Sequence, residues 1–525
     1  MLLKLGTTLS TKSHEVLRCL SASKRWSSSA SQGIFLNTSQ REVVSPRKAR
    51  KASEIPGPKR WPLIGSFYSI ATESDYPPDK IHLYWDDCFK KYGPIFRLDT
   101  PGQKPTVFIY LPEHVDKLLK HTPESERTVF KIISLVRNAD ETGSFAKNEA
   151  GLLFEGHEQG GRLRKLTQGP TMKMKILSQY LHKMDSISLE FLDKIYGLRD
   201  ENNDLPEDTL DHIFHWAMES LCLVTFSRRI GCFEGSEESA QIIQDIHNFL
   251  ISVREVAFEF GNLWQWFRTP AYRKFERAHN KILEYVREVV ENSKVTLKSK
   301  LEDDKDLDLI ETLLATPGMK LSDMYTYLVD FLAAGIDNTS ATVAFTVLNL
   351  ARHPEKQARV QDELDRVLGK EVDELKPHHL SQLSYLKGAV KETLRLNPVS
   401  FGIIREPESD VEIGGYTIPA GFAVFVLTKQ SAMMEEHFPK PTEFLPERWL
   451  RDRPMGSINP FASIPFGIGP RSCIGRRLAE QEMYTLLARM FHKYNFEWRH
   501  GDVGTRMNLL LLPDKPLRFT MTKRQ

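Results

Sequence analysis

Cys473 is the residue of this chain whose surroundings are best suited to binding a metal. It lies in the glycine-rich segment 466–475, which reads Phe-Gly-Ile-Gly-Pro-Arg-Ser-Cys-Ile-Gly. Across residues 479–491 apolar side chains recur at three- and four-residue spacing, which predicts a helix with one buried face. The cysteine therefore precedes a positive helix terminus, where amides and the helix dipole favour a thiolate. Gly469 and Gly475 are expected to let the backbone turn tightly and approach a flat ligand.

A free cysteine in a turn is more often a small buried apolar residue than a metal ligand. Here the neighbours favour the ligand, because residues 466–475 match the spaced pattern F-x-x-G-x-R-x-C-x-G. The segment resembles the haem-ligand loop of the cytochrome P-450 family. The resemblance implies haem b (iron protoporphyrin IX), with Cys473 as the axial ligand of its iron. The other haem contacts it implies in this loop are Phe466, Gly467, Arg471 and Gly475.

The composition is that of an ordinary folded protein. Among 525 residues 41% are apolar, and 71 Lys and Arg balance 69 Asp and Glu. A chain of this length buries a large core, and its balanced charge gives no indication of a nucleic-acid partner. No internal repeat or linker follows residue 60, so one large domain is predicted. The five cysteines are scattered without the paired spacing of a disulfide framework or zinc site, which fits a reducing compartment.

The amino-terminal segment differs in kind from the rest of the chain. Residues 1–53 hold ten Lys or Arg against Glu15 and Glu42, and they are rich in serine. This composition is typical of a mitochondrial transit peptide, and no run approaches the ~20 apolar residues that span a bilayer. The alternative is a disordered basic tail that carries no targeting signal. We therefore predict a transit segment at 1–53 and a catalytic domain at 54–525.

The remaining patterns predict a mostly helical protein with a minor β-sheet region. Three prolines and two glycines make residues 55–65 a stiff, extended segment, which resembles the proline-rich hinge of the family. Residues 95–98 and 107–110 alternate as a short hairpin does, and a second strand region lies at 411–426. Helical patterns dominate between them, so the cytochrome P-450 fold is expected.

Residues 322–350 form a predicted helix that is apolar on nearly every side and should be buried, with Ser322 as its cap. Inside it, Gly335 costs about 1 kcal/mol relative to alanine, and Asp337 needs a partner or a shifted pKa. Close approach of a planar cofactor accounts for the glycine, and a carboxylate beside an alcohol can relay protons to dioxygen. A long core helix with a satisfied aspartate accounts for the pattern equally well.

Residues 334–337 read Ala-Gly-Ile-Asp and resemble the A-G-x-D of the oxygen-activating helix of the family. The family usually has threonine directly after the acid, whereas this chain has Asn338 there and Thr339 one residue later. One helical step rotates a side chain by about 100°, so Thr339 is not expected to substitute without local distortion. Asn338 can instead position a water, because its amide both donates and accepts. The resemblance implies haem contacts from Ala334 and Gly335 and catalytic roles for Asp337, Asn338 and Thr339.

A structural charge network is predicted from two further segments. Glu392 and Arg395 are three residues apart on one helical face, within reach of each other. The segment 444–449 resembles the P-E-R-W element of the family, and its Arg448 would complete the network. Such a buried triad adds little net stability, but the loss of one member leaves an uncompensated charge.

Further cofactor contacts are expected from cations outside the cysteine loop. Arg405 follows an apolar extended stretch and is assigned to a haem propionate beside Arg471. The helix expected to supply more contacts lacks the tryptophan of the family and carries two adjacent glycines, which weaken a helix. Solvated surface charges are the alternative for its cations. The candidate residues of this helix are His157, Arg162 and Arg164.

Two basic pairs predict the electron donor. Lys387 and Lys391 are one helical turn apart, and Arg476 and Arg477 follow the cysteine loop. The pairs match basic positions by which mitochondrial members of the family bind an acidic 2Fe–2S ferredoxin. Exposed charges often serve solubility alone, but charges beside the ligand loop favour electrostatic guidance of a partner.

The predicted function is a haem-thiolate monooxygenase of the ferredoxin-dependent mitochondrial type. The resemblance implies a lipophilic substrate, such as a sterol, steroid or secosteroid, and peripheral association with the matrix side of the inner membrane. Two alternatives remain open: a haem-thiolate isomerase or dehydratase of an oxygenated lipid, and a non-catalytic haem or lipid binding protein. An aromatic run would form the membrane-dipping lip of the cavity, unless it is helix core: Phe258, Phe260, Trp264, Trp266 and Phe267.

Overall fold

The computed structural model describes residues 49–122, 131–140, 142–145, 151–153, 157–172, 174–257, 259–303 and 306–524. These residues all belong to one compact unit, 49–525. Strand β1 (Arg50–Lys51) pairs in parallel with β6 (Tyr416–Ile418), and the Arg50 guanidinium lies 4.0 Å from the centre of the Tyr416 ring. The folded body therefore begins before the predicted boundary at residue 54. Residues 1–48 of the predicted transit segment lie outside the described part.

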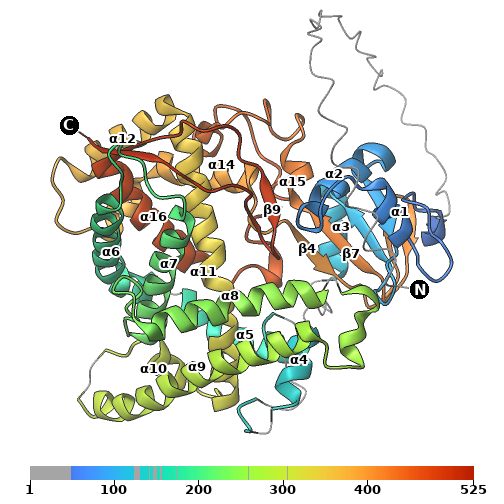
Figure 1. Cartoon of the computed structure of the whole chain (residues 1–525), viewed down its shortest axis with the longest axis horizontal. Coiled ribbons are helices and arrows are strands. Elements are labelled where there is room, and N and C mark those ends of the chain that lie inside the picture. The colour runs from blue at the N-terminus through green and yellow to red at the C-terminus, as the bar shows by residue number, and fades with distance from the viewer. Residues whose placement is uncertain are drawn as a thin grey trace, which may run out of the picture. The chain divides into compact units, whose positions relative to one another are not determined.

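Helices dominate the described chain, as predicted, and the strands form a smaller part of it (Figure 1). The helices are α1 (Phe67–Glu73), α2 (Ile81–Tyr92), α3 (Pro112–His121), α4 (Lys131–Asn138), α5 (His157–Met172), α6 (Met174–Gly197), α7 (Thr209–Phe226), α8 (Glu237–Ala257), α9 (Pro270–Glu302), α10 (Leu309–Leu314), α11 (Leu321–Arg352), α12 (Pro354–Leu368), α13 (Pro377–Gln382), α14 (Ser384–Leu396), α15 (Thr428–Ala432) and α16 (Arg476–Lys493). Short 3₁₀ turns include η4 (Phe260–Gln265), η5 (Pro446–Trp449) and η6 (Gly469–Arg471).

Helix α11 is the centre around which the other helices pack. It contacts α7, α9, α14 and α16, and Figure 1 shows it running through the middle of the helical region. Among the described helices, only α11 is long and apolar enough to cross a membrane, yet 78% of its most apolar window is buried inside the protein. It is therefore a core helix, as its pattern predicted. Its cap is Lys320 instead of the predicted Ser322, because the Asp323 carboxylate accepts the Lys320 N–H at 2.9 Å.

Within the described ranges, the strands form one four-stranded sheet and three smaller ones. The predicted hairpin is present as β2 (Ile95–Leu98) paired antiparallel with β3 (Thr106–Ile109). In the same sheet β7 (Ala423–Leu427) lies parallel to β3, and β4 (Gly402–Arg405) lies antiparallel to β7. In this order β4, with Arg405 at its end, is the edge strand next to β7. The smaller sheets contain β1, β5 (Val411–Ile413) and β6; β8 (Tyr494–Glu497) and β11 (Thr520–Lys523); and β9 (Thr505–Met507) and β10 (Leu511–Pro513).

The predicted charge network joins α14 to η5 in the protein interior. Arg395 donates to both Glu392 oxygens, at 2.9 and 2.7 Å, and Arg448 Nε donates to Glu392 Oε1 at 3.0 Å. All three residues are buried. The carboxylate also accepts the Trp449 Nε1–H at 2.9 Å and the Leu445 N–H at 3.1 Å, two contacts that the spacing alone did not predict. Five donors on one buried carboxylate fix the segment that leads to the cysteine loop.

Replacing Glu392 with alanine is expected to lower the free energy of unfolding by about 3–5 kcal/mol, because two buried guanidinium groups lose their counter-charge. Urea unfolding followed by circular dichroism measures this loss. The control is Glu284→Ala, which breaks an exposed pair with Lys281 at 2.7 Å and should change the free energy by less than about 1 kcal/mol. Equal losses in the two variants would contradict the structural role of the network.

Candidate functional site

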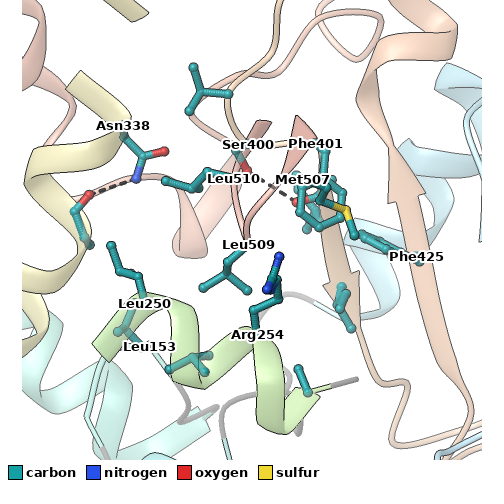
Figure 2. A pocket seen from close by; sticks show the side chains of 18 of the residues that line it. Leu153, Leu250, Arg254, Asn338, Ser400, Phe401, Phe425, Met507, Leu509 and Leu510 are labelled. Carbon is teal, nitrogen blue, oxygen red and sulfur yellow. Dashed lines mark hydrogen bonds between the residues drawn. The ribbon is translucent and has the colours of Figure 1, made fainter. Parts of the chain in front are cut away.

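A cavity of about 1400 Å³ lies between the helical region and the sheets, and its wall is mostly apolar. Its walls come from distant segments: α8, α11, the 399–406 stretch, the 507–510 turn and the cysteine loop. Figure 2 shows residues of α8, α11, the 399–406 stretch and the 507–510 turn converging on one space. Cys473 lines this cavity, so the sulfur faces a volume large enough for a flat cofactor and a substrate.

The loop that carries Cys473 is folded back on itself by backbone hydrogen bonds. The Cys473 N–H donates to the Phe466 carbonyl at 2.7 Å, and the Ser472 N–H donates to the Gly469 carbonyl at 3.0 Å. Gly467 and Gly469 have φ of 67° and 77°, a region that favours glycine. Gly475 also lies in a turn, directly before α16, but its φ of −86° and ψ of 3° are open to other residues, so this turn does not require glycine. An added Cβ there would meet Phe331 at an ordinary 3.6 Å.

The surroundings of Cys473 act on its charge in opposite directions. Its surface is open to the cavity, but protein atoms enclose it, and this desolvation raises the pKa of the thiol. The Gly475 N–H and the charges of Arg164 and Arg476 oppose the rise without cancelling it. The helix terminus alone therefore does not produce the thiolate that we predicted. A metal ion bound at the sulfur would do so, because coordination deprotonates a thiol.

Two buried arginines form a cationic wall of the same cavity. Arg405, at the end of β4, and Arg471, in η6, both line it. Burial and the neighbouring charge of Arg471 lower the pKa of Arg405 to about 10, and Arg405 Nε has no hydrogen-bond partner among the described residues. Two cations in one desolvated wall favour an anionic ligand. The carboxylates of a haem fit this requirement, so the donor set of the cavity fits the cofactor implied by the resemblance.

The three residues of α5 that were predicted to contact the cofactor differ in their positions in the structure. Arg164 lines the cavity, and its Nη2 donates to the Ser472 carbonyl at 2.6 Å, which braces the cysteine loop. Arg162 does not line the cavity; its guanidinium binds the Asp323 carboxylate at 2.9 and 2.5 Å. This placement favours a structural role for Arg162 over the predicted cofactor contact. The side chain of His157 lies outside the described part of the chain.

The predicted oxygen-activating segment of α11 presents an amide and a hydroxyl to the cavity. Asn338 and Thr339 both line it, together with Ala334 and Gly335. Asn338 Nδ2 donates to the Ala334 carbonyl at 2.8 Å, which Figure 2 marks, and Thr339 Oγ1 donates to the Gly335 carbonyl at 2.8 Å. Each side chain therefore donates one hydrogen bond to a backbone carbonyl of its own helix. The Asn338 carbonyl oxygen remains as a hydrogen-bond acceptor next to the space above the sulfur.

Asp337 faces a different direction from its neighbour. It is half-buried and does not line the cavity. Desolvation and the charge of Asp211, in the first turn of α7, raise the pKa of Asp337 to about 7. This carboxyl therefore titrates near neutral pH. The predicted acid and amide lie next to each other in sequence, but the helix directs them to different sides.

Packing against a neighbouring helix accounts for the glycine at position 335, which we had attributed to a cofactor contact. A Cβ added to it would lie 2.7 Å from Leu221 Cδ2, on the neighbouring helix α7. The small residue therefore allows α7 and α11 to pack closely. Contact with a planar cofactor is not needed to account for it.

Glu482 is a buried carboxyl that the sequence reasoning missed. It lies on α16 at the cavity wall and is 2% exposed. Desolvation raises its pKa to about 8, and the one hydrogen bond described for it comes from Ser220 Oγ at 2.9 Å. The signal in the sequence was an acid directly before Met483, on the face predicted to be buried.

Arg254, on α8, is a second cavity residue that the sequence reasoning missed. It belongs to a helix that no motif marked. A single cation on an amphipathic helix gives no sign in the sequence of facing a cavity.

The basic pairs are connected through one acidic residue. The Lys387 ammonium lies 5.7 Å from the centre of the Tyr484 ring, and the charges of Lys391 and Glu480 act on it. Glu480 in turn accepts a hydrogen bond from Arg476 at 2.9 Å. Helices α14 and α16 therefore present these cations on one surface, which begins directly after the cysteine loop. Arg477 is exposed at the start of α16.

Comparison with known proteins agrees with this geometry. The family model described as Cytochrome P-450 matches residues 55–521. The chain is 30% identical to probable cytochrome P-450 49a1 of Drosophila melanogaster, over 91% of this chain and 84% of that protein. It is also 30% identical to the mitochondrial cytochrome P-450 302a1 of the same species, over 91% of this chain and 96% of that protein. Cytochrome P-450 10 of Lymnaea stagnalis is 27% identical, over 90% and 86% of the two chains.

The raised pKa of Glu482 predicts a pH dependence of stability. The folded state holds the proton between pH 4.5 and about 8, whereas the unfolded chain releases it. Stability should therefore fall as pH rises through this window, by up to about 1.4 kcal/mol per pH unit. Thermal unfolding of the wild type and of Glu482→Gln should be measured at several pH values between 5 and 8. The difference between the two proteins gives the contribution of Glu482 to the pH dependence, because glutamine does not titrate.

Glu480→Gln is the control for this experiment, since it removes a carboxylate two residues away that is only partly buried. That variant should keep the slope of the wild type. Parallel curves for the wild type and Glu482→Gln would show that Glu482 is not protonated in the folded protein.

Proposed function

Because the chain belongs to the cytochrome P-450 family of haem-thiolate monooxygenases, we propose that it hydroxylates a lipophilic substrate in mitochondria with electrons from a 2Fe–2S ferredoxin. Members of the family bind haem b through a cysteine thiolate. The observation that carries the proposal is one cavity that combines the Cys473 sulfur, two buried arginines and an apolar wall. A sterol, steroid or secosteroid is the substrate class that we propose.

The residues that would hold the cofactor are distributed around the cavity. Cys473 would bind the iron, and Arg405 and Arg471 would bind the propionates. Arg164 keeps the cysteine loop in place through its bond to Ser472. When bound, the haem supplies the chemistry of dioxygen: one oxygen atom enters a C–H bond of the substrate, and two electrons and two protons convert the other to water.

The chain itself supplies a dry space and a route for protons. Leucine and phenylalanine side chains of the cavity wall exclude bulk water from the substrate. The Asn338 carbonyl oxygen can hold a water in the cavity, in the position where the family usually has a hydroxyl. Asp337 exchanges a proton near neutral pH because its pKa is about 7. A water chain around the helix would connect the two residues.

The mitochondrial location is proposed from two independent observations. Residues 1–53 have the composition of a transit peptide, and several relatives carry "mitochondrial" in their names. A 2Fe–2S ferredoxin is acidic in the mitochondrial systems that the sequence resembles. The surface of Lys387, Lys391, Arg476 and Arg477 offers the complementary charge directly behind the cysteine loop.

Peripheral attachment to the matrix side of the inner membrane is part of the proposal. In the aromatic run after α8, Trp266 is 80% exposed and Phe267 is 70% exposed, so two large rings face solvent. Trp264 is buried and belongs to the core, while Phe258 and the side chain of Phe260 lie outside the described part. Exposed aromatic rings of this kind suit the boundary between water and lipid.

A second candidate function is isomerisation or dehydration of an already oxygenated lipid. The observation that favours it is Asn338, because an amide cannot donate a proton in the way that the usual hydroxyl does. This reaction would use the same thiolate-bound cofactor without external electrons. The basic surface near the cysteine loop favours the monooxygenase.

Turnover experiments distinguish these functions. With a lipophile library, purified holoprotein should form hydroxylated product only when dioxygen, NADPH, ferredoxin reductase and ferredoxin are all present. Cys473→Ala should lose tightly bound haem and the absorption band of the reduced carbonyl complex for which the family is named. Product formed without electrons would support the isomerase. A normal carbonyl complex without consumption of any substrate would indicate a binding protein.

Reversing the charge of the basic surface should weaken the ferredoxin complex. We expect Lys387→Glu with Lys391→Glu to raise the KM for ferredoxin roughly 10-fold or more at low salt, because two attractive charges become repulsive. The wild-type KM should rise with ionic strength, and the difference between the proteins should shrink. Lys281→Glu, on α9, is the matched control and should leave the KM unchanged. An unaltered KM in the double variant would exclude this surface as the docking site.

A further inference from the structure

Arg254 is the cavity residue that neither the cofactor nor the proton route explains. It lies one turn before the end of α8, and it shares the cavity-facing side of that helix with Leu250 and Val253. The spacing of these residues is that of one helical face. Figure 2 shows its side chain pointing from α8 into the cavity beside Leu509. A cation is therefore built into the wall where substrate must lie.

Several other charged groups in the cavity wall form ion pairs within the protein. Glu255 pairs with Lys274 at 3.4 Å, and Asp330 with Arg137 at 2.6 Å. Glu406 pairs with Lys104 at 2.5 Å. No hydrogen bond or ion pair joins Arg254 to any of the described residues. Among the described residues, none therefore occupies the N–H donors of this guanidinium.

The space that the Arg254 side chain enters is lined in part by apolar residues. Figure 2 shows Leu509, Met507 and Phe425 around the space that it enters. The Arg254 side chain is half-buried, and a carboxylate that binds its guanidinium from the cavity forms charge-assisted hydrogen bonds, which are stronger than those of neutral groups. Guanidinium geometry matches a carboxylate with two parallel hydrogen bonds. An apolar or hydroxyl-bearing ligand would leave most of these donors unsatisfied.

The position of Arg254 along α8 sets the orientation of such a ligand. In Figure 2 Leu250 lies on the side of the cavity near Asn338, and Arg254 lies one helical turn further from it, about 6 Å along the axis. A ligand whose anionic end binds Arg254 therefore extends its apolar body past Leu250 toward the segment of α11 that carries Asn338. That segment and Cys473 line the same cavity.

We propose that Arg254 binds the carboxylate of a lipophilic carboxylic acid and so directs the apolar end of that acid toward Cys473. The inference rests on the proposed function only in taking this cavity as the substrate cavity. It narrows the substrate class from neutral sterols and steroids to acids with an apolar body, either a straight chain or a fused-ring skeleton. The position of oxidation would then be remote from the carboxylate.

Equilibrium dialysis of the oxidised holoprotein tests this without turnover, because no electron donor is present. The probes are dodecanoic acid with 1-dodecanol, and a cholanoic acid with its corresponding alcohol. At least one acid should bind the wild type roughly 10- to 100-fold more tightly than its alcohol, as expected for a charge-assisted pair. Arg254→Met should remove that preference, whereas Arg254→Lys should keep part of it. Leu250→Ala is the matched control and should weaken acid and alcohol equally.

Three results would overturn the inference. The first is equal binding of acid and alcohol to the wild type in both probe pairs. The second is an acid preference that Arg254→Met leaves intact. The third is loss of haem from Arg254→Met, which would assign the arginine to the cofactor. If Arg254→Met fails to fold, binding of each acid and of its methyl ester to the wild type is compared, since the ester removes the charge from the ligand instead. Equal binding of acid and ester would then overturn the inference. Failure of the monooxygenase assay would leave these binding results unchanged.

Discussion

The sulfur of Cys473 is the atom on which the rest of the site depends, because the fold places it where neither water nor a helix dipole fully stabilises its charge. Desolvation outweighs the Gly475 amide and the nearby cations, and the pKa of the thiol stays raised. Binding of iron is what makes the thiolate favourable at this position. The loop bonds from Cys473 to Phe466 and from Arg164 to Ser472 hold the sulfur in place before the metal arrives. The site is thus organised by the protein and completed by the cofactor.

Buried charge is used in two distinct ways around this sulfur. The Glu392 carboxylate is saturated with donors from α14, η5 and the preceding turn, so it rigidifies the path to the cysteine loop. Arg405 and Arg254 are cations with donors left over, and both face the cavity. A saturated network stabilises one conformation, whereas an incomplete one binds a ligand. This difference separates the structural charges of the protein from those that recognise a molecule.

The features that could be predicted from the sequence are those determined by residues close together in the chain or by a known motif. The cysteine loop, the β2–β3 hairpin, α11 and the network of Glu392 with Arg395 follow from spacing within a few residues or from a known motif, and the structure has them. Arg162 binds Asp323, and Gly335 makes room for Leu221. Both facts depend on partners far along the chain. Arg254 and Glu482 were missed for the same reason, because only packing decides which face of a helix meets the cavity.

The separation of Asn338 from Asp337 shows how a single substitution changes a site without dismantling it. The helix keeps the acid on the side of α7, where Asp211 and desolvation bring its pKa to about 7. The residue that reaches the cavity is an amide bonded to Ala334, which accepts a hydrogen bond but holds no acidic proton. Protons must therefore pass through water, and the dry wall allows little of it. A substrate anchored at a distance, with its apolar body filling the rest of the cavity, would confine that water to the neighbourhood of Asn338, where it is needed.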